Sequence, residues 1–273
     1  MKNLLISKVA FTLFGIDIYW YGIIITSAII LDFLILMFFC KKRGFDQSLP
    51  YDLVLVLLPS AIFMARLFAV IFEPNLTLAD YFDFKGGGLS ILGALVGGTI
   101  GLVVYCHFKK LDFFRLADIL APLVILGQAM GRWGNYFNGE VYGKEILDES
   151  LQWFPLAVQI GGEWYEALFF YEFVLNLIGF ALLVTLLYTF KKKRGIVLGT
   201  YLIYYGTIRF FLETRRQAEF VYKVGNVAMS QLIAGLMAVA GLTLLIVLYI
   251  LDHKKKKELN QTVRAYNGQD ESK

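Results

Sequence analysis

A short polar segment, residues 131–143, holds the side chains best suited to chemistry. It reads Gly-Arg-Trp-Gly-Asn-Tyr-Phe-Asn-Gly-Glu-Val-Tyr-Gly and directly follows the apolar run 116–130. Polar groups this dense at the end of a membrane-type segment are costly unless they line a cavity or a site. Its arginine, Arg132, can present a planar fork of hydrogen-bond donors to an oxyanion such as a phosphate. We therefore place the candidate site here.

A second arginine in an apolar run, Arg209, is the expected partner. Arg132 and Arg209 each fall near the end of a predicted membrane span, so we expect both to point into one cavity and to hold a phosphate together. Tyr205 and Glu213 lie one helical turn before and after Arg209. This polar stripe also fits an ordinary i,i+4 salt bridge, which stabilises a helix only slightly in water.

Charged side chains recur within the apolar runs. They are Asp32, Arg66, Asp118, Arg132, Glu172 and Arg209. Any one of them could pair with another to fix helix register. Burying all of them for register alone would be expensive, so the set indicates a functional interior.

Other kinds of catalytic site are not indicated by the sequence. It shows no zinc-ligand spacing, P-loop, Rossmann glycine pattern or Ser-His-Asp arrangement, so we expect no metal, no cofactor and no nucleic-acid partner. The two histidines, His107 and His253, lie beside basic clusters at the ends of apolar runs. Cys40 and Cys106 lie in similar places, and we interpret both as small apolar residues without a disulfide.

The elements that must position these residues are membrane spans. Hydrophobic residues make up 58% of the 273 residues and charged residues only 18%, whereas soluble domains average about 25% charged. A span needs roughly 20 mainly apolar residues. Seven runs qualify or nearly qualify: 18–39, 53–72, 89–108, 116–130, 168–190, 197–212 and 227–251. The fold class is therefore an all-α, polytopic membrane protein, and the fourth and sixth runs are short for full spans.

Charge in the connecting segments predicts the orientation. Basic clusters at 41–43, 109–115, 191–194 and 254–257 follow the first, third, fifth and seventh runs, while the opposite connections are rich in Asp and Glu. The positive-inside rule then puts the N-terminus outside and the C-terminus in the cytoplasm. The pair Arg215-Arg216 falls on the outer side, where anionic headgroup binding is a candidate explanation.

The expected organisation is one membrane domain followed by a tail. Residues 1–252 form the seven-helix domain, with an outer loop 133–166 long enough for a small cap, and residues 253–273 form a polar cytoplasmic tail with a disordered or frayed helical end. The glycine-rich segment 86–101 favours close helix packing. Alternatively, its first three glycines lie at the start of a helix and expose backbone N–H groups that bind an anion.

Taken together, these motifs resemble the prolipoprotein diacylglyceryl transferase family of bacteria. The family signature Gly-Arg-x-Gly-Asn-Phe-x-Asn-x-Glu-x-x-Gly is matched at Gly131, Arg132, Gly134, Asn135, Asn138, Glu140 and Gly143, with Tyr136 where Phe is usual. Further segments resemble the family's helix motifs: Trp20-Tyr21-Gly22, Ala65-Arg66-Leu67, Asp118 with Ala121-Pro122, Tyr171-Glu172, and Tyr205-Gly206 with Arg209 and Glu213. The resemblance covers most of the chain.

The resemblance implies a function and a set of site residues. Such an enzyme, in the bacterial cell membrane with its site toward the outer face, transfers the diacylglyceryl group of phosphatidylglycerol to the lipobox cysteine of a signal-peptide-bearing prolipoprotein and releases glycerol phosphate. The implied catalytic residues are Arg132, Arg209 and Glu140. The implied substrate-binding residues are Tyr21, Arg66, Gly87, Gly88, Asn135, Asn138, Gly143, Tyr205 and Glu213.

Two positions depart from the family pattern. Leu92 stands where many members have a histidine in Gly-Gly-x-x-x-His-Gly, and Glu166-Ala167 replaces a usual His-Pro. If that histidine is the thiol base elsewhere, this chain uses another base, relies on an arginine-lowered thiol pKa, or is inactive. A second hypothesis is therefore an inactive or divergent paralogue that binds phospholipid or lipoprotein signal peptides. A third, from another class, is a transporter that uses the charged cavity.

Overall fold

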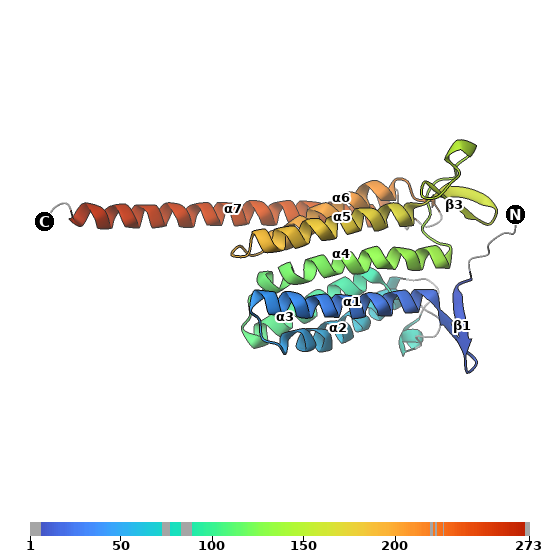
Figure 1. The fold of residues 1–273 in the computed structure, drawn as a ribbon, viewed down its shortest axis with the longest axis horizontal. Coiled ribbons are helices and arrows are strands. Elements are labelled where there is room, and N and C mark those ends of the chain that lie inside the picture. The colour runs from blue at the N-terminus through green and yellow to red at the C-terminus, as the bar shows by residue number, and fades with distance from the viewer. Residues whose placement is uncertain are drawn as a thin grey trace. The chain divides into compact units, whose positions relative to one another are not determined.

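The computed structural model describes residues 7–72, 77–82, 89–218, 221, 223–225 and 227–270. Seven α-helices occur in the described part of the chain (Figure 1). They are α1 (Trp20–Arg43), α2 (Leu49–Phe72), α3 (Ile91–Lys109), α4 (Phe113–Asn138), α5 (Leu168–Thr189), α6 (Ile196–Glu213) and α7 (Met229–Asp270). Six of them, all except α6, are long and apolar enough to cross a membrane. The prediction of a mostly helical, polytopic membrane protein is therefore confirmed.

Short elements accompany the helices. Three two-stranded antiparallel sheets pair β1 (Val9–Leu13) with β2 (Ile16–Tyr19), β3 (Ala157–Ile160) with β4 (Glu163–Glu166), and β5 (Lys223–Val224) with β6 (Val227–Ala228). Two 3₁₀ helices, η1 (Leu78–Phe82) and η2 (Glu149–Leu151), complete the described elements. The β1–β2 and β3–β4 hairpins lie outside the spans, where backbone groups can reach water.

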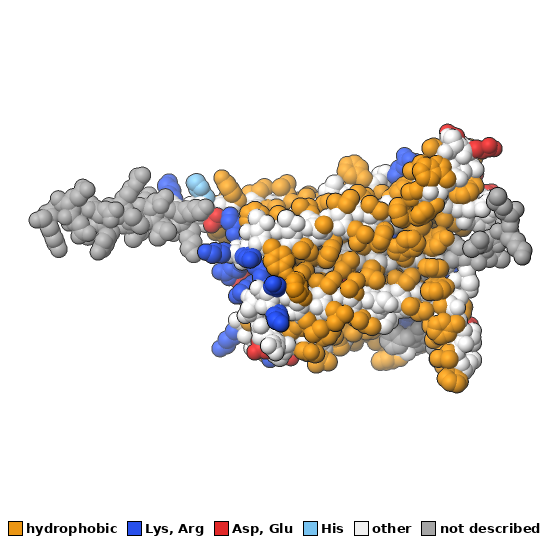
Figure 2. Space-filling view, viewed as in Figure 1, with side chains coloured by type: hydrophobic (Ala, Val, Ile, Leu, Met, Phe, Trp, Pro, Cys, Tyr) orange, Lys and Arg blue, Asp and Glu red, His pale blue; other side chains and the backbone are white. Residues whose placement is uncertain are grey.

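The side chains exposed along the helices are mostly hydrophobic, as Figure 2 shows. Residues such as Leu55, Phe63, Phe211 and Val239 are more than half exposed although they lie in the middle of apolar helices. A soluble protein would bury such surface, because large exposed apolar patches are unfavourable in water. These flanks therefore suit contact with lipid.

The chain divides into two compact units, and each is described by itself. One contains residues 1–28 and 124–273, and the other contains residues 29–123. In the first unit α6 runs beside α5 and α7, and in the second α2 runs beside α3 (Figure 1). Within each unit the basic clusters lie at one end: Lys109 of α3 pairs with Asp52 at the start of α2, and Lys193 pairs with Asp252 of α7.

Two helices extend beyond their predicted bounds. The helix α4 was expected to end at Met130, but it continues through the polar segment to Asn138, so the expected outer loop 133–166 begins only at Gly139. Gly139 ends it by adopting a left-handed φ of 65°, a common way for a helix to stop. The helix α7 continues to Asp270, through a tail for which a disordered or frayed helical end was expected.

Glycines of α3 allow α2 and α3 to pack closely, as the spacing predicts. Gly93, Gly97 and Gly101 are buried and face α2. A Cβ on Gly97 would lie 2.6 Å from the Cβ of Met64, far inside van der Waals contact. Gly98, the next residue, has nothing within 4 Å of its Cβ position. Close packing, the first interpretation of this segment, is therefore confirmed for its described part.

This contrast supplies a matched test of the α2–α3 contact. Gly97→Ala should destabilise the protein by about 1–3 kcal/mol, since overpacking forces backbone and side-chain shifts. Gly98→Ala should be neutral or stabilise by up to about 1 kcal/mol, since alanine has the higher helix propensity. Thermal unfolding of both variants in detergent measures the difference, and equal effects would contradict this packing.

Candidate active site

A single carboxylate joins the two arginines that the sequence pairs. Glu172 of α5 places Oε1 3.4 Å from Nε of Arg132 on α4, and its Oε2 accepts a 2.9 Å hydrogen bond from Nη1 of Arg209 on α6. The Glu172 side chain is 3% exposed, and those of Arg132 and Arg209 are 12% and 15% exposed. Three helices therefore meet through one largely buried ion-paired group.

The polar segment 131–143 forms a hydrogen-bonded chain that leads away from Arg132. Nη1 of Arg132 donates to Oδ1 of Asn135 over 3.2 Å, and Nδ2 of Asn135 donates to Oε1 of Glu140 over 3.1 Å. Nδ2 of Asn138 donates to the same Glu140 oxygen over 3.2 Å. The turn at Gly139 makes this possible, because it folds Glu140 back over the last turn of α4.

The network also continues from Arg209 to the end of α6. Nη2 of Arg209 donates to Oε2 of Glu213 over 3.1 Å, and Arg216 lies 3.5 Å from the same oxygen. The i,i+4 salt bridge expected between Arg209 and Glu213 is therefore present, in a setting where Glu213 is almost fully buried. Burial and the repulsion of the other arginines lower the pKa of Arg216, although the nearby Glu213 carboxylate raises it in part.

Charges of opposite sign alternate along this network. The order is Arg132, Glu172, Arg209, Glu213 and Arg216, so three guanidiniums meet two carboxylates. One positive charge is left uncompensated within these five groups. An anion with forked oxygens complements that surplus, because arginine pairs well with phosphate and carboxylate groups.

Tyr21 covers one side of the segment. A Cβ added to Gly134 would lie only 2.5 Å from Cδ2 of the Tyr21 ring, so only glycine fits at position 134. Trp20 stacks on Phe137 with centroids 5.0 Å apart, which fixes the start of α1 against the end of α4. Tyr21 therefore packs directly against the polar segment 131–143.

Tyrosines of α6 extend the site toward the middle of the helices. Tyr205 lies one helical turn before Arg209 on α6. The Tyr205 ring stacks on Tyr201 at 5.8 Å with an interplanar angle of 9°, and Gln128 of α4 donates to the Tyr201 hydroxyl over 3.0 Å. Gln128, Tyr201 and Tyr205 are all buried.

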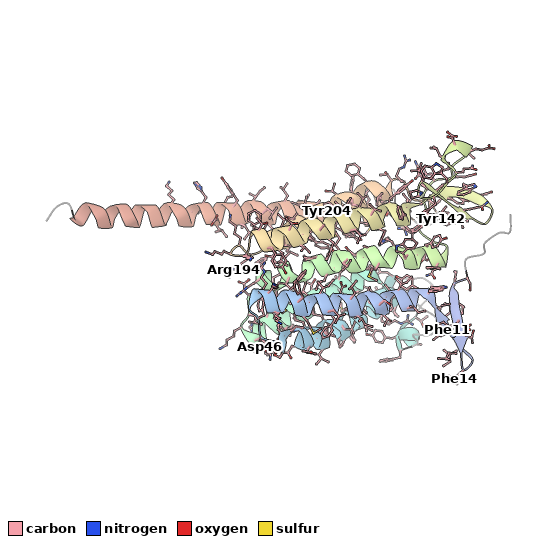
Figure 3. The ribbon with its side chains drawn as sticks, in the orientation of Figure 1. Phe11, Phe14, Asp46, Tyr142, Arg194 and Tyr204 are labelled. Carbon is pink, nitrogen blue, oxygen red and sulfur yellow. The ribbon has the colours of Figure 1, made fainter. Side chains whose placement is uncertain are left out.

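A small cap follows the segment, as the loop length predicts. Gly143 donates its backbone N–H to the Glu166 carbonyl over 2.9 Å and forms an antiparallel bridge with Arg216. Tyr142, labelled in Figure 3, packs on Tyr165 of the β3–β4 hairpin with centroids 4.5 Å apart. The hydrogen bond to Glu163 and partial burial raise the pKa of Tyr165 to about 12.

The basic pair Arg215-Arg216 forms ion pairs with carboxylates of the same unit. Arg215 pairs with Glu166 at the end of β4, and Arg216 pairs with Glu213. Headgroup binding was the candidate explanation for both arginines. Their ion pairs give them a structural role, and Arg216 joins the site's charge network.

Three of the expected site residues are not among these contacts. Arg66 belongs to the other unit, where it is 1% exposed and its Nε donates to the Tyr81 carbonyl over 3.2 Å. Gly87 and Gly88 lie outside the described residues. Asp32, Asp118 and Leu92 also belong to the unit of Arg66.

Sequence reasoning gave too little weight to two residues. Glu172 was noted as an intramembrane charge but not assigned to the site, although it is the carboxylate that both arginines share. Arg216 was noted as a topological exception with headgroup binding as its candidate role, and it was not assigned to the site. A signal for Glu172 was available, because a buried charge in a span points to a partner of opposite sign.

The arrangement can bind a phosphoryl group and stabilise charge that develops on it. Guanidiniums held in a water-poor interior are worth more than in water and need no reorganisation during reaction. Both histidines lie elsewhere, His107 in α3 and His253 in α7. Cys40 and Cys106 are buried free thiols outside this network.

Comparison with known proteins identifies the family. Residues 8–247 match the family model described as prolipoprotein diacylglyceryl transferase. The chain belongs to this family.

Relatives named phosphatidylglycerol–prolipoprotein diacylglyceryl transferase match nearly the whole chain. The Finegoldia magna protein is 37% identical over 255 residues, covering 92% of this chain and 97% of the relative. A Clostridium perfringens protein with the same name, numbered 1, is 33% identical over 258 residues, covering 92% and 98%. A Clostridium botulinum protein is 37% identical over 237 residues, covering 84% and 91%. The resemblance drawn from the motifs is therefore confirmed, and the chain is a member of a transferase family.

The shared carboxylate should be essential for the stability of this transferase family member. Glu172→Ala leaves two largely buried guanidiniums without their common partner, which should cost about 3–5 kcal/mol, the usual effect of breaking a buried ion pair. Thermal or denaturant unfolding in detergent measures the loss. Glu149→Ala, which removes an exposed carboxylate of the cap, is the control and should change stability by less than about 0.5 kcal/mol. Equal stability of the two variants would contradict the role of Glu172.

Proposed function

We propose that this protein transfers the diacylglyceryl group of phosphatidylglycerol to the lipobox cysteine of a prolipoprotein, releasing glycerol phosphate. The observation that carries the proposal is the meeting of Arg132 and Arg209 at one buried carboxylate near the ends of α4 and α6. That geometry supplies two guanidiniums to one phosphate. Family membership supplies the reaction, which is the one named for the relatives.

The arginines bind the phosphodiester and stabilise the leaving group. The substrate thiolate attacks the carbon of the diacylglyceryl group that is bonded to a phosphate oxygen. A C–S bond forms while the bond between that carbon and the phosphate oxygen breaks. The electron pair of that bond goes to the phosphate, which gains one negative charge as glycerol phosphate leaves. The uncompensated positive charge of the network stabilises this gain, and positioning of the two reactants supplies the rest.

The phosphate competes with Glu172 for the arginine donors. Glu172 pairs with both guanidiniums and keeps them oriented, although its single charge offsets only one of theirs. A bound phosphate takes over part of this role, with no charge left unpaired in the interior. Removal of one such donor typically costs on the order of 10²–10³ in rate.

The thiol proton leaves without a histidine at position 92. Leu92 occupies that place, and a free thiol has a pKa of about 8.5. Cationic neighbours lower a thiol pKa because they favour the thiolate. Arg132 and Arg209 provide that charge. Glu140, the one carboxylate of the motif, has its Oε1 held by two asparagines and receives the proton.

The remaining motif residues shape the binding surface. Asn135 and Asn138 hold Glu140, and Tyr21 packs over Gly134. Gly143 anchors the cap through Glu166. Arg66, Gly87 and Gly88 complete the substrate-binding set by resemblance to the family.

The two arginines give a direct test. Arg132→Ala and Arg209→Ala should each reduce thioether formation on a lipobox peptide by at least about 10² in vesicles containing phosphatidylglycerol. Complementation of a cell that lacks its own transferase measures the same loss, whichever group removes the thiol proton. Lys191→Ala, in the exposed basic cluster at the opposite end of the same unit, should keep full activity. Full activity of either site variant would refute the phosphate clamp.

The proposed location is the bacterial cell membrane, with the site toward the outer face. The cap and the basic clusters fall at opposite ends of the first unit, and cytoplasmic loops favour Lys and Arg. In a background with Cys40 and Cys106 replaced by alanine, Ser150→Cys should react with an impermeant maleimide in intact cells. Lys254→Cys should react only after permeabilisation, and the reverse pattern would invert the topology.

A further inference from the structure

A second polar layer lies one helical turn below the arginines. In the first unit, Gln128 precedes Arg132 by four residues on α4, Tyr205 precedes Arg209 by four on α6, and Asn176 follows Glu172 by four on α5. Because α5 runs opposite to α4 and α6, all three steps lead away from the cap by about 6 Å. Tyr201 joins this layer through its hydrogen bond with Gln128.

Asn176 faces the other two helices. On one side of it, Glu172 contacts Arg132 and Arg209. On the other side, a Cβ on Gly179 would meet the side chains of Tyr204 and Ile125, the latter at 2.6 Å. Residues 172, 176 and 179 share one helix face, so Asn176 lies between α4 and α6 as well.

The floor of the layer is apolar and tightly packed. Tyr204, labelled in Figure 3, donates its hydroxyl to the Leu175 carbonyl over 2.7 Å and thereby fixes α6 against α5. Ile125 packs against Gly179 from α4. The polar layer is therefore bounded below by this contact and above by the arginines.

Buried polar atoms in this layer have no partner among the described residues. Asn176 is 0% exposed, and neither its Oδ1 nor its Nδ2 is hydrogen-bonded. Gln128 is 5% exposed, and its Oε1 is unpaired although its Nε2 donates to Tyr201. Most buried polar groups in proteins are paired, and an unpaired one costs roughly 1–3 kcal/mol.

We propose that this layer, centred on Asn176 and Gln128, binds the neutral oxygen groups that flank the lipid phosphate. The inference rests on the proposed function, because the phosphate must lie at the arginines. In a phosphatidylglycerol, both the acyl-ester carbonyls and the headgroup hydroxyls are only a few covalent bonds from the phosphate. One helical turn spans that distance. The side-chain amide of Asn176 offers donors and an acceptor, and Gln128 offers an acceptor, so ester and hydroxyl oxygens both find partners.

The layer would then contribute to the choice of lipid. A site built to hydrogen-bond a substrate group discriminates against an analogue that lacks it, because the site's own polar groups stay unpaired. The arginines recognise any phosphodiester. Asn176 and Gln128 therefore recognise the ester or hydroxyl groups that are attached to the phosphodiester.

The test compares three lipids with the full-length wild type and Asn176→Leu. The lipids are diester phosphatidylglycerol, its dialkyl-ether analogue, and a diester lipid whose headgroup lacks hydroxyls. Thioether formation on a cysteine peptide is measured for each. With diester phosphatidylglycerol, Asn176→Leu should be about tenfold slower, the worth of about one hydrogen bond to a neutral group.

The lipid analogues identify the group that Asn176 contacts. The wild-type advantage over Asn176→Leu should disappear with the ether lipid if the carbonyls are bound, and with the deoxy headgroup if the hydroxyls are bound. A variant that is equally slow with all three lipids has only a structural defect, and a variant as fast as wild type has no such contact. Either result overturns the inference.

Stability supplies a second readout. Replacing an unpaired buried amide with a leucine of similar size should leave the melting temperature unchanged or raise it. Thr185→Val on the exposed face of α5 is the matched polar-to-apolar control and should change neither activity nor lipid preference. A large fall in the melting temperature of Asn176→Leu would show that the amide is a structural element.

Lipid retention separates this inference from the proposed function. If the wild type forms no thioether with any lipid, the transfer function fails. The amount of each lipid that remains bound to purified wild type and to Asn176→Leu then decides the inference alone. Equal retention of all three lipids by both proteins would overturn it.

Discussion

The position of Glu172 between Arg132 and Arg209 is the contact on which the site depends. Two guanidiniums confined to an apolar interior would repel one another and lose their hydration, and the shared carboxylate offsets both costs. It also ties α4, α5 and α6 together at one level. The same pairing suits the arginines to a further anion, since two guanidiniums carry one more charge than Glu172 offsets.

Around this contact, the segment 131–143 performs two tasks. Its first part is helical and presents Arg132 and Asn135 inward, while the turn at Gly139 returns Glu140 to the end of the helix. Its last residue, Gly143, joins the cap. The glycines are explained by close approach at Gly134, under the Tyr21 ring, and by backbone conformation at Gly139. The segment therefore determines local folding and also carries the proposed catalytic residues.

Much of this was readable from the sequence, and the failures have physical causes. Apolar runs and buried charges revealed the spans and both arginines, since a charge in a membrane helix is rarely accidental. The continuation of α4 past Met130 was not readable, because glycines and asparagines favour loops, whereas contacts such as Trp20 with Phe137 keep the segment helical. The central role of Glu172 depends on three helices meeting in space.

The directions of the helices at the site have a consequence for how an anion is held. α4 and α6 end here and α5 begins here. Backbone dipoles therefore place partial negative charge at two of the three helix ends and partial positive charge at the third. The arginines lie near the negative ends and Glu172 near the positive one, so each side chain is matched to its own helix. An incoming phosphate meets two ends whose backbone would repel it, which makes guanidinium side chains, rather than helix amides, the means of its capture.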